Sequence, residues 1–258
     1  MSGTFTPRPG AAPLLRQVRA QTLMEARLML RNGEQLLLAV VIPLLVLVGG
    51  VLAAGRLGLA LDGRSAVDVL TPGVLALAVM STSFTSLAIA TGFERRYGVL
   101  KRLGTAPLPR SGLLTGKVGA LLIVQVLQVL AVGTVAAALG WRPTSALPAL
   151  AGAVLLAACG TAAFAALGLL LAGSLRAEAT LAAANLIYLL LLTAGAVVLP
   201  AATYGWFGDV AVWLPSGALG EGLRGALLDA AVPLREIAVL LAWAALGTLL
   251  TARTFSWE

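Results

Sequence analysis

The stretch FERRYGVLKRLGTAPLPRSGLLTGK, residues 93–117, separates two long apolar runs and holds the densest group of charges in the chain. Its first part, Phe93 to Leu103, is predicted to form one short helix. Glu94 lies in the first turn of this helix and Lys101 and Arg102 lie in its last turn, which suits the helix dipole at both ends. We therefore expect a short basic helix held between two membrane-spanning segments.

The residues that follow are predicted to end this helix and to begin the next one. Gly104 stands where a left-handed cap would fall. Pro107 and Pro109 prevent the helix from continuing, while Ser111 can cap the following helix. The alternative that composition alone leaves open is an ordinary positively charged cytoplasmic loop.

The composition of the chain is typical of a membrane protein. Of its 258 residues, 59% are hydrophobic and only 11% are charged, which is far more apolar than a globular domain in water. No segment outside the apolar runs is long enough to bury a core of its own. We expect a cytoplasmic tail and an interfacial helix in residues 1–35, followed by one transmembrane domain in residues 36–258.

The expected fold class is an all-α membrane protein with six transmembrane helices. A helix of about 20 apolar residues crosses about 30 Å of hydrocarbon. Segments that meet or approach this length lie at about residues 36–55, 69–92, 118–140, 147–171, 179–200 and 234–252. The last span is the shortest, because only its residues from Ile237 to Ala252 form an uncharged run.

The segment Leu14 to Arg31 is predicted to be an amphipathic helix that lies along the membrane surface. At about 100° per residue its arginines fall within one arc of roughly 120°, opposite most of its apolar residues. Such a helix suits anionic headgroups. Glu25 falls on the apolar side and makes the pattern imperfect. The alternative is a positively charged flank that only fixes the orientation of the first span.

The segment between residues 201 and 232 is too polar to span a membrane and too rich in Gly, Trp and Leu for an ordinary loop. Trp206, Phe207 and Trp213 suit a membrane interface. Pro215 begins a short amphipathic helix. We expect an external hairpin here, either re-entrant or lying on the surface.

The distribution of positive charge indicates the orientation of the chain. With the N-terminus in the cytoplasm, thirteen of the 18 Lys and Arg residues lie inside. The five outside are Arg56, Arg64, Arg142, Arg224 and Arg235. Both termini are then cytoplasmic, and the many alanines and arginines favour a bacterial plasma membrane. Basic residues placed by this rule need no nucleic-acid partner.

Several kinds of chemistry are missing from the sequence. The chain has no histidine and a single cysteine, Cys159, so the usual metal centres, haem sites and Cys/His catalytic sites are not expected. The sequence at residues 112–118 lacks the spacing and the Ser or Thr of a phosphate-binding loop. No ionisable residue occupies the middle of a span, which disfavours an ion-coupled carrier. A protein that moves a substrate without its own energy source needs an external motor.

A few polar residues lie inside the predicted spans. They are Ser81, Ser83, Thr85, Gln125, Gln128, Asn185 and Tyr188. They can line a path for an amphipathic substrate, or they can hold the helices together by hydrogen bonds.

The charged stretch also carries a family resemblance. Its residues are Glu94, Arg95, Arg96, Tyr97, Gly98, Val99, Leu100, Lys101, Arg102 and Leu103, followed by Pro107 and Lys117. This order resembles the signature after the second span in membrane subunits of type-2 ATP-binding-cassette (ABC) exporters, particularly the actinobacterial drug-resistance type. A looser match, Pro215 to Arg224, resembles the element before the last span in that family.

The resemblance implies that the segment from Phe93 to Leu103 is a coupling helix seated in a separate ATPase subunit. The residues implied in this contact are Glu94, Arg95, Arg96, Tyr97, Gly98, Lys101, Arg102, Leu103 and Pro107. ATP and Mg would bind only the partner, so this chain is not expected to be an enzyme. A second copy or a related permease would complete an exporter of drugs or lipids, with roles in multidrug efflux and antibiotic resistance.

Two other functions remain open at this point. One is a membrane enzyme that handles lipids, for which Asp209, Glu221 and Asp229 are the candidate acid or base residues. The other is a non-transporting membrane scaffold, supported by the helices rich in small residues.

Overall fold

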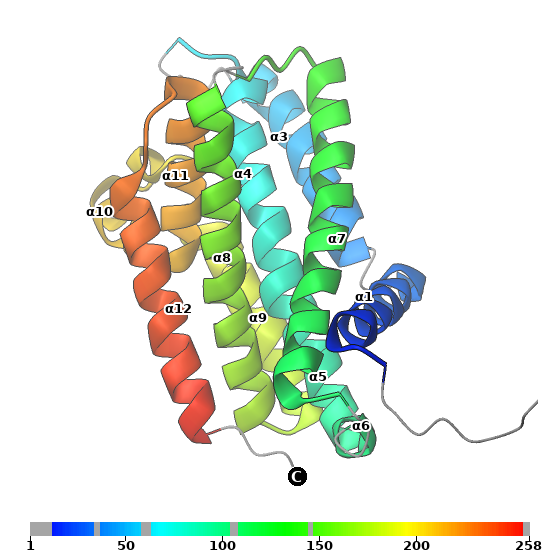
Figure 1. Ribbon diagram of the computed structural model, residues 1–258. Coiled ribbons are helices and arrows are strands. Elements are labelled where there is room, and N and C mark those ends of the chain that lie inside the picture. The colour runs from blue at the N-terminus through cyan, green and yellow to red at the C-terminus, as the bar shows by residue number, and fades with distance from the viewer. Residues whose placement is uncertain (1–11, 34–36, 58–62, 104–107, 144–146, 255–258) are drawn as a thin grey trace, which may run out of the picture.

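The computed structural model describes residues 12–33, 37–57, 63–103, 108–143 and 147–254, and within these ranges it contains helices and no strands (Figure 1). Six helices are long and apolar enough to cross a membrane. They are Ala39–Arg56, Ala66–Arg96, Ser111–Ala138, Leu147–Ser174, Ala177–Ala194 and Leu234–Thr254. The expected all-α membrane fold with six candidate spans is therefore confirmed.

The first half of the chain supplies the first three spans, which are built from six of its elements, and the two further helices α1 and α6. In order they are α1 (Leu14–Arg31), η1 (Leu37–Val41), α3 (Ile42–Leu57), α4 (Ala66–Met80), η2 (Ser81–Ser86), α5 (Leu87–Arg96), α6 (Val99–Leu103) and α7 (Arg110–Ala138). The elements α4, η2 and α5 form one continuous second span with a π-helical turn at its middle. Ser111 was predicted to cap the helix that follows Pro107 and Pro109. In the structure, α7 begins at Arg110 and its N-cap residue is Pro109.

The second half contains the other three spans and a folded insertion. Its elements are α8 (Leu147–Ser174), α9 (Ala177–Ala194), η3 (Ala201–Phe207), α10 (Gly208–Ala211), α11 (Pro215–Asp229) and α12 (Leu234–Thr254). The second span is buried along most of its length, with the other helices around it (Figure 1). Large apolar side chains of the outer helices remain exposed on this single chain, as expected of surfaces that face lipid or another membrane subunit.

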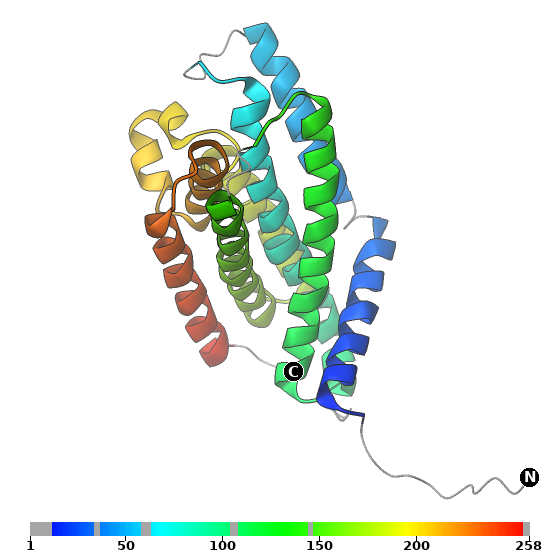
Figure 2. The ribbon, with the colours of Figure 1, turned by 45° about the horizontal axis from the view of Figure 1, so that its top comes forward.

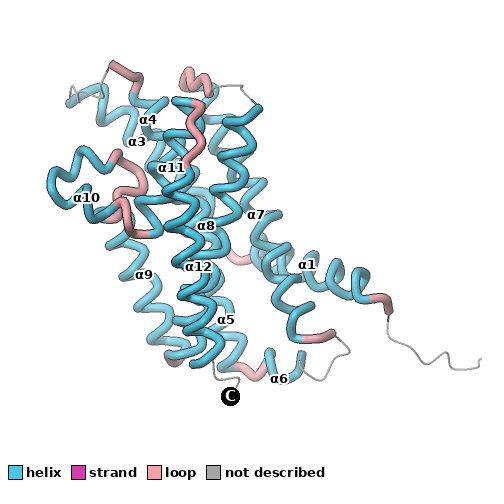
Figure 3. Tube along the Cα trace, turned by 60° about the vertical axis from the view of Figure 1, so that its left-hand side comes forward, coloured by secondary structure: helices cyan, strands magenta, loops and turns pink. Residues whose placement is uncertain are grey.

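Helix α1 packs against α7 and projects from the side of the bundle (Figures 2 and 3). Two glycines of α7 allow this close approach. A Cβ atom at Gly116 would lie 2.5 Å from the Gln21 side chain, and one at Gly119 would lie 2.8 Å from the Thr22 hydroxyl. The contact side of α1 is thus fixed by packing as well as by its charge pattern.

The fifth span is shorter than predicted. Helix α9 ends at Ala194 rather than near Pro200, and the chain then leaves the helix before η3 and α10. Helix α11 returns into the bundle, where it packs against α4, α8 and α12 and is largely buried (Figure 1). The helix predicted to begin at Pro215 is therefore a buried part of the bundle.

Candidate functional site

The predicted single helix from Phe93 to Leu103 is wrong in one respect, because the structure breaks it in two. Helix α5 ends at Arg96, and Gly98 follows with a φ of 66°. Residues other than glycine seldom adopt this left-handed conformation. The glycine therefore turns the chain out of the span into α6. The cap expected at Gly104 and the residue Pro107 lie outside the described residues.

A buried charge cluster lies directly behind this turn. The Lys117 ammonium on α7 is 2.7 Å from Glu94 Oε1 on α5 and 3.0 Å from Glu25 Oε1 on α1. Lys117 is only 5% exposed. Gln21 also donates a hydrogen bond to Glu25 Oε1, at 2.8 Å. One lysine thus joins three helices that are far apart in the sequence.

The cluster explains the irregularity noted in the amphipathic pattern of α1. Glu25 falls on the apolar face because that face meets α7, where Lys117 neutralises it. A charge buried in a protein needs such a partner. The sequence showed Glu25 as a misplaced charge and Lys117 as part of a family signature, but it gave no signal that they meet.

Two of the three arginines between Phe93 and Leu103 contact other parts of this chain. Arg95 donates hydrogen bonds to the carbonyl oxygens of Gly173 and Leu175, at 2.6 and 2.5 Å. Arg96 is exposed and forms an ion pair with Glu178. Both contacts bind the end of α5 to the turn between α8 and α9 and to the start of α9. The resemblance implied that these arginines meet an ATPase, and within this chain they also hold α5 in place.

Other members of the predicted ATPase-contact set are exposed. Tyr97 is 64% exposed and stacks on Phe93, with ring centroids 6.1 Å apart. Lys101 and Arg102 are also exposed, on α6. Leu103 is half-buried. The segment therefore has an exposed side that carries Arg96, Tyr97, Lys101 and Arg102, and an inner side anchored by Glu94 and Arg95.

Replacing Gly98 by alanine tests whether the turn matters. A non-glycine residue in this conformation costs about 1–2 kcal/mol, so we expect the midpoint of thermal unfolding to fall by a few degrees. Gly133→Ala on α7 is the matched control, because a Cβ there meets nothing within 4 Å. Thermal unfolding of both purified variants checks this. Equal midpoints for the two variants would show that the turn does not need a glycine.

The polar residues predicted inside the spans form a hydrogen-bonded network around η2. Thr82 donates to Gln128 at 2.9 Å, and Gln125 donates to Ser83 at 2.8 Å. Thr161 of α8 donates to Gln125 at 3.0 Å. The network joins the second, third and fourth spans, which accords with the alternative of helix-to-helix hydrogen bonding.

The remaining candidates for a substrate path are scattered. Tyr188 is buried, with its hydroxyl near Ser81. Thr85 is buried, and its hydroxyl has no hydrogen-bond partner among the described residues. Asn185 is half-buried on α9, outside the network around η2. The structure thus brings Ser83, Gln125 and Gln128 together and leaves Asn185 apart.

A second buried charge site lies at the opposite end of the bundle. Arg224 of α11 donates to the carbonyl oxygens of residues 196–199, at 3.0–3.3 Å. It also pairs with Glu221 at 2.9 Å, and Glu221 accepts a hydrogen bond from the Ala201 backbone at 2.7 Å. Arg224 therefore satisfies carbonyl groups of the non-helical segment that follows α9.

This end of the bundle is also closely packed. A Cβ at Gly73 of α4 would lie 2.4 Å from the Val198 carbonyl oxygen. Burial raises the pKa of Tyr204, although the nearby Arg224 charge opposes the shift. Within the described ranges there is no group of three or more side chains that could hold a metal ion.

Two of the acidic residues considered for a lipid enzyme, Glu221 and Asp229, line one cavity, but each is held in its own ion pair. Glu221 is held by Arg224, and Asp229 pairs with Arg64 at 2.5 Å. Asp209 is exposed on α10. No paired carboxylates for acid and base work are brought together by these three residues.

Comparison with known proteins identifies the family. A family model described as ABC-2 type transporter matches residues 16–228, which run from α1 to α11 and include the charge cluster and the Arg224 site. No curated protein matches the chain significantly. Because the match covers most of the sequence, the chain belongs to the ABC-2 type transporter family.

Proposed function

We propose that this chain is the permease subunit of an ABC exporter in a bacterial plasma membrane. It provides the path for a hydrophobic or amphipathic substrate, a drug or a lipid. A separate cytoplasmic ATPase binds ATP and Mg and supplies the energy. The observation that carries the proposal is the Glu25–Lys117–Glu94 cluster, which lies behind the exposed segment at α6 and joins it to α1 and α7.

The cluster gives a physical route for coupling. The ATPase would contact Tyr97, Lys101 and Arg102, which are exposed side chains of the segment. Movement of α5 would then pull on Lys117 and hence on α7 and α1. Arg95 and Arg96 would carry the same movement to α8 and α9. ATP binding can drive such a change because it favours one of two conformations of the partner.

The proposal includes an orientation in the membrane and an assembly with other subunits. Both termini and α6 face the cytoplasm, α1 lies along the inner membrane surface, and α11 re-enters the membrane from the outside. Two permease copies, or this chain and a related one, combine with two ATPase subunits. Membrane lipids cover the remaining apolar faces.

The substrate path is proposed to lie near the polar residues of η2, α7 and α9. Ser81, Ser83, Thr85, Gln125, Gln128, Asn185 and Tyr188 are its candidate lining residues. Asn185 is the most accessible of the seven in this single chain, because the others are buried.

A charge reversal in the exposed face tests the contact with the ATPase. The permease is co-expressed with the ATPase of its own genomic neighbourhood and purified through a tag on the permease. We expect Lys101→Glu to lower the amount of copurified ATPase severalfold, because it reverses a charge on the docking face. Arg253→Glu is the control, since Arg253 is also exposed and basic but lies at the end of α12.

Two results would contradict the proposal. One is the absence of any ATPase with the unaltered permease. The other is an equal yield of ATPase with Lys101→Glu and Arg253→Glu, since the contact would then lie elsewhere or depend only on net charge.

A further inference from the structure

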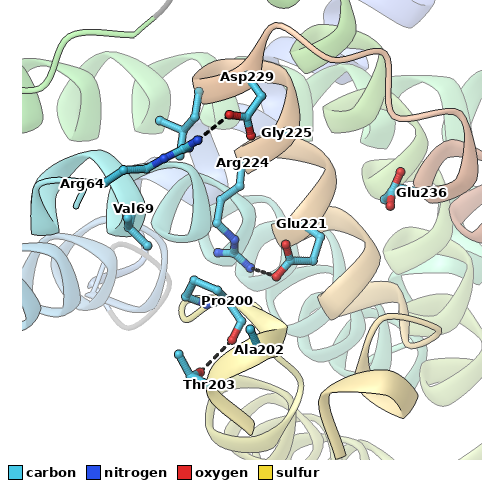
Figure 4. Close-up of a pocket in the computed structure, with 11 residues that line it drawn as sticks. Arg64, Val69, Pro200, Ala202, Thr203, Glu221, Arg224, Gly225, Asp229 and Glu236 are labelled. Carbon is cyan, nitrogen blue, oxygen red and sulfur yellow. Dashed lines mark hydrogen bonds and ion pairs between the residues drawn. The ribbon is translucent and has the colours of Figure 1, made fainter. Parts of the chain in front are cut away.

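A cavity of about 650 Å³ lies at the end of the bundle opposite α6 (Figure 4). It is bounded by the beginning of α4, by α11, by the beginning of α12 and by the turn at Pro200. Its volume is in the range of small-molecule sites. The network around η2 does not contribute to it, so this cavity is separate from the proposed substrate path.

The cavity has more negative than positive charge. Arg64 is paired with Asp229 at 2.5 Å, and Arg224 is paired with Glu221 at 2.9 Å (Figure 4). Glu236 also lines the cavity and has no ion pair or hydrogen bond within the described part of the chain. Each arginine of the cavity is thus paired with one carboxylate, and the Glu236 carboxylate has no partner among the described residues.

Arg224 is poorly placed to attract an anion. Its guanidinium already faces four backbone carbonyl oxygens and the Glu221 carboxylate. It is also 5% exposed, so its donors are not open to an occupant of the cavity. The excess carboxylate favours a cation in this space.

The other walls and surroundings of the cavity suit an apolar chain. Val69, Pro200 and Leu228 line it alongside the charged groups. The neighbouring insertion consists of η3 and α10. Trp206 lies on η3 and is 81% exposed, and Trp213 lies just after α10. Exposed tryptophans are typical of the level of lipid headgroups. An occupant with a positive head and an apolar tail matches both sets of groups.

We infer that this cavity binds the ammonium headgroup of an amphiphile from the outer leaflet, with Glu236 as the carboxylate that selects the positive charge. The inference rests on the proposed function for the assignment of this end of the bundle to the outer side. Its ammonium group could belong to a free amphiphile such as a cationic drug or to the head of a phosphatidylethanolamine lipid.

Direct binding to the full-length protein tests the site. The probe is radiolabelled dodecyltrimethylammonium, measured on immobilised protein in the uncharged detergent dodecyl maltoside. Glu236→Gln removes the unpaired charge and nearly keeps the shape, so we expect affinity to fall about threefold to tenfold. Asp209→Asn is the control, since it removes an exposed acidic charge outside the cavity, and we expect it to bind as the unaltered protein does.

A second variant and a competing amphiphile test whether binding depends on charge. Glu236→Lys should abolish binding while the elution volume and thermal midpoint of the protein stay unchanged. Unlabelled octaethylene glycol monododecyl ether, which has the same chain and no charge, should compete poorly. Equal binding by the Gln, Lys and Asn variants, or equal competition by the uncharged amphiphile, would overturn the inference.

Added lipid distinguishes the two sources of the ammonium group. Displacement of the probe by phosphatidylethanolamine, and not by its N-acetylated form, identifies a lipid headgroup as the ligand. Failure of both lipids to displace a probe that still depends on Glu236 identifies a free amphiphile. No ATPase is present in this assay, so binding can fail while the ATPase still copurifies, and the reverse result is equally visible.

Discussion

Replacing Lys117 by methionine is expected to cost the folded permease about 3–5 kcal/mol and to abolish ATP-driven transport. Methionine keeps much of the length of lysine and removes its charge. Glu25 and Glu94 would then remain in a largely buried site without the one cation that pairs with both of them. Yield after size-exclusion chromatography and the midpoint of thermal unfolding measure the loss.

Loss of folding alone would not show that the cluster transmits movement, so a compensated variant is needed. The triple variant Glu25→Gln, Glu94→Gln and Lys117→Met removes all three charges together. Replacing a complete buried charge group with neutral groups is often tolerated. We expect this protein to fold nearly as well as the original but to show transport reduced at least severalfold, because α5, α7 and α1 are no longer held together by charge. Full transport by the triple variant would show that the cluster has only a structural role.

The spans could be predicted because they depend on local composition. About 20 apolar residues are required to cross the bilayer, and each of the six segments meets or approaches that length within its own sequence. The amphipathic pattern of α1 is also local, since four arginines repeat with the helical period. In both cases the information lies within a few turns of one helix.

The turn at Gly98 was not predicted because the sequence offers two glycines that could end the helix. Both Gly98 and Gly104 can adopt the left-handed conformation that ends a helix. Local sequence favoured the later one, since Lys101 and Arg102 suit the last turn of a helix. The structure ends α5 at Arg96, where Arg95 and Arg96 bind the turn between α8 and α9. That contact spans about 80 residues of sequence and leaves no periodic signal.

The charge cluster and the end of α9 were missed for the same physical reason. Lys117 meets partners 23 and 92 residues away in the chain. Arg224 meets carbonyl groups 25–28 residues away. A single sequence shows which polar residues need a partner in a membrane, such as Glu25, but not which partner they find.

Replacing Arg224 by methionine is expected to prevent most of the protein from reaching its folded state. The side chain makes hydrogen bonds to four backbone carbonyls and pairs with Glu221, and its removal leaves these groups buried without donors. A buried polar group left without its partner costs about 1–3 kcal/mol. The amount of monodisperse protein after extraction in mild detergent should fall about tenfold or more, which corresponds to a loss of at least about 1.4 kcal/mol.

Two other variants separate the role of the guanidinium from that of the charge. Arg224→Lys keeps the charge but has three donors on one nitrogen, which cannot reach four carbonyl groups and a carboxylate together. We expect its yield to lie much closer to that of Arg224→Met than to that of the original protein. Arg64→Met removes an arginine from the same end of the bundle, but its ion pair with Asp229 is substantially exposed, so the expected cost is below about 1 kcal/mol. A yield for Arg224→Lys equal to that of the original protein would show that Arg224 acts mainly by balancing the charge of Glu221. The end of α9 at Ala194 would then need a cause other than the carbonyl contacts of Arg224.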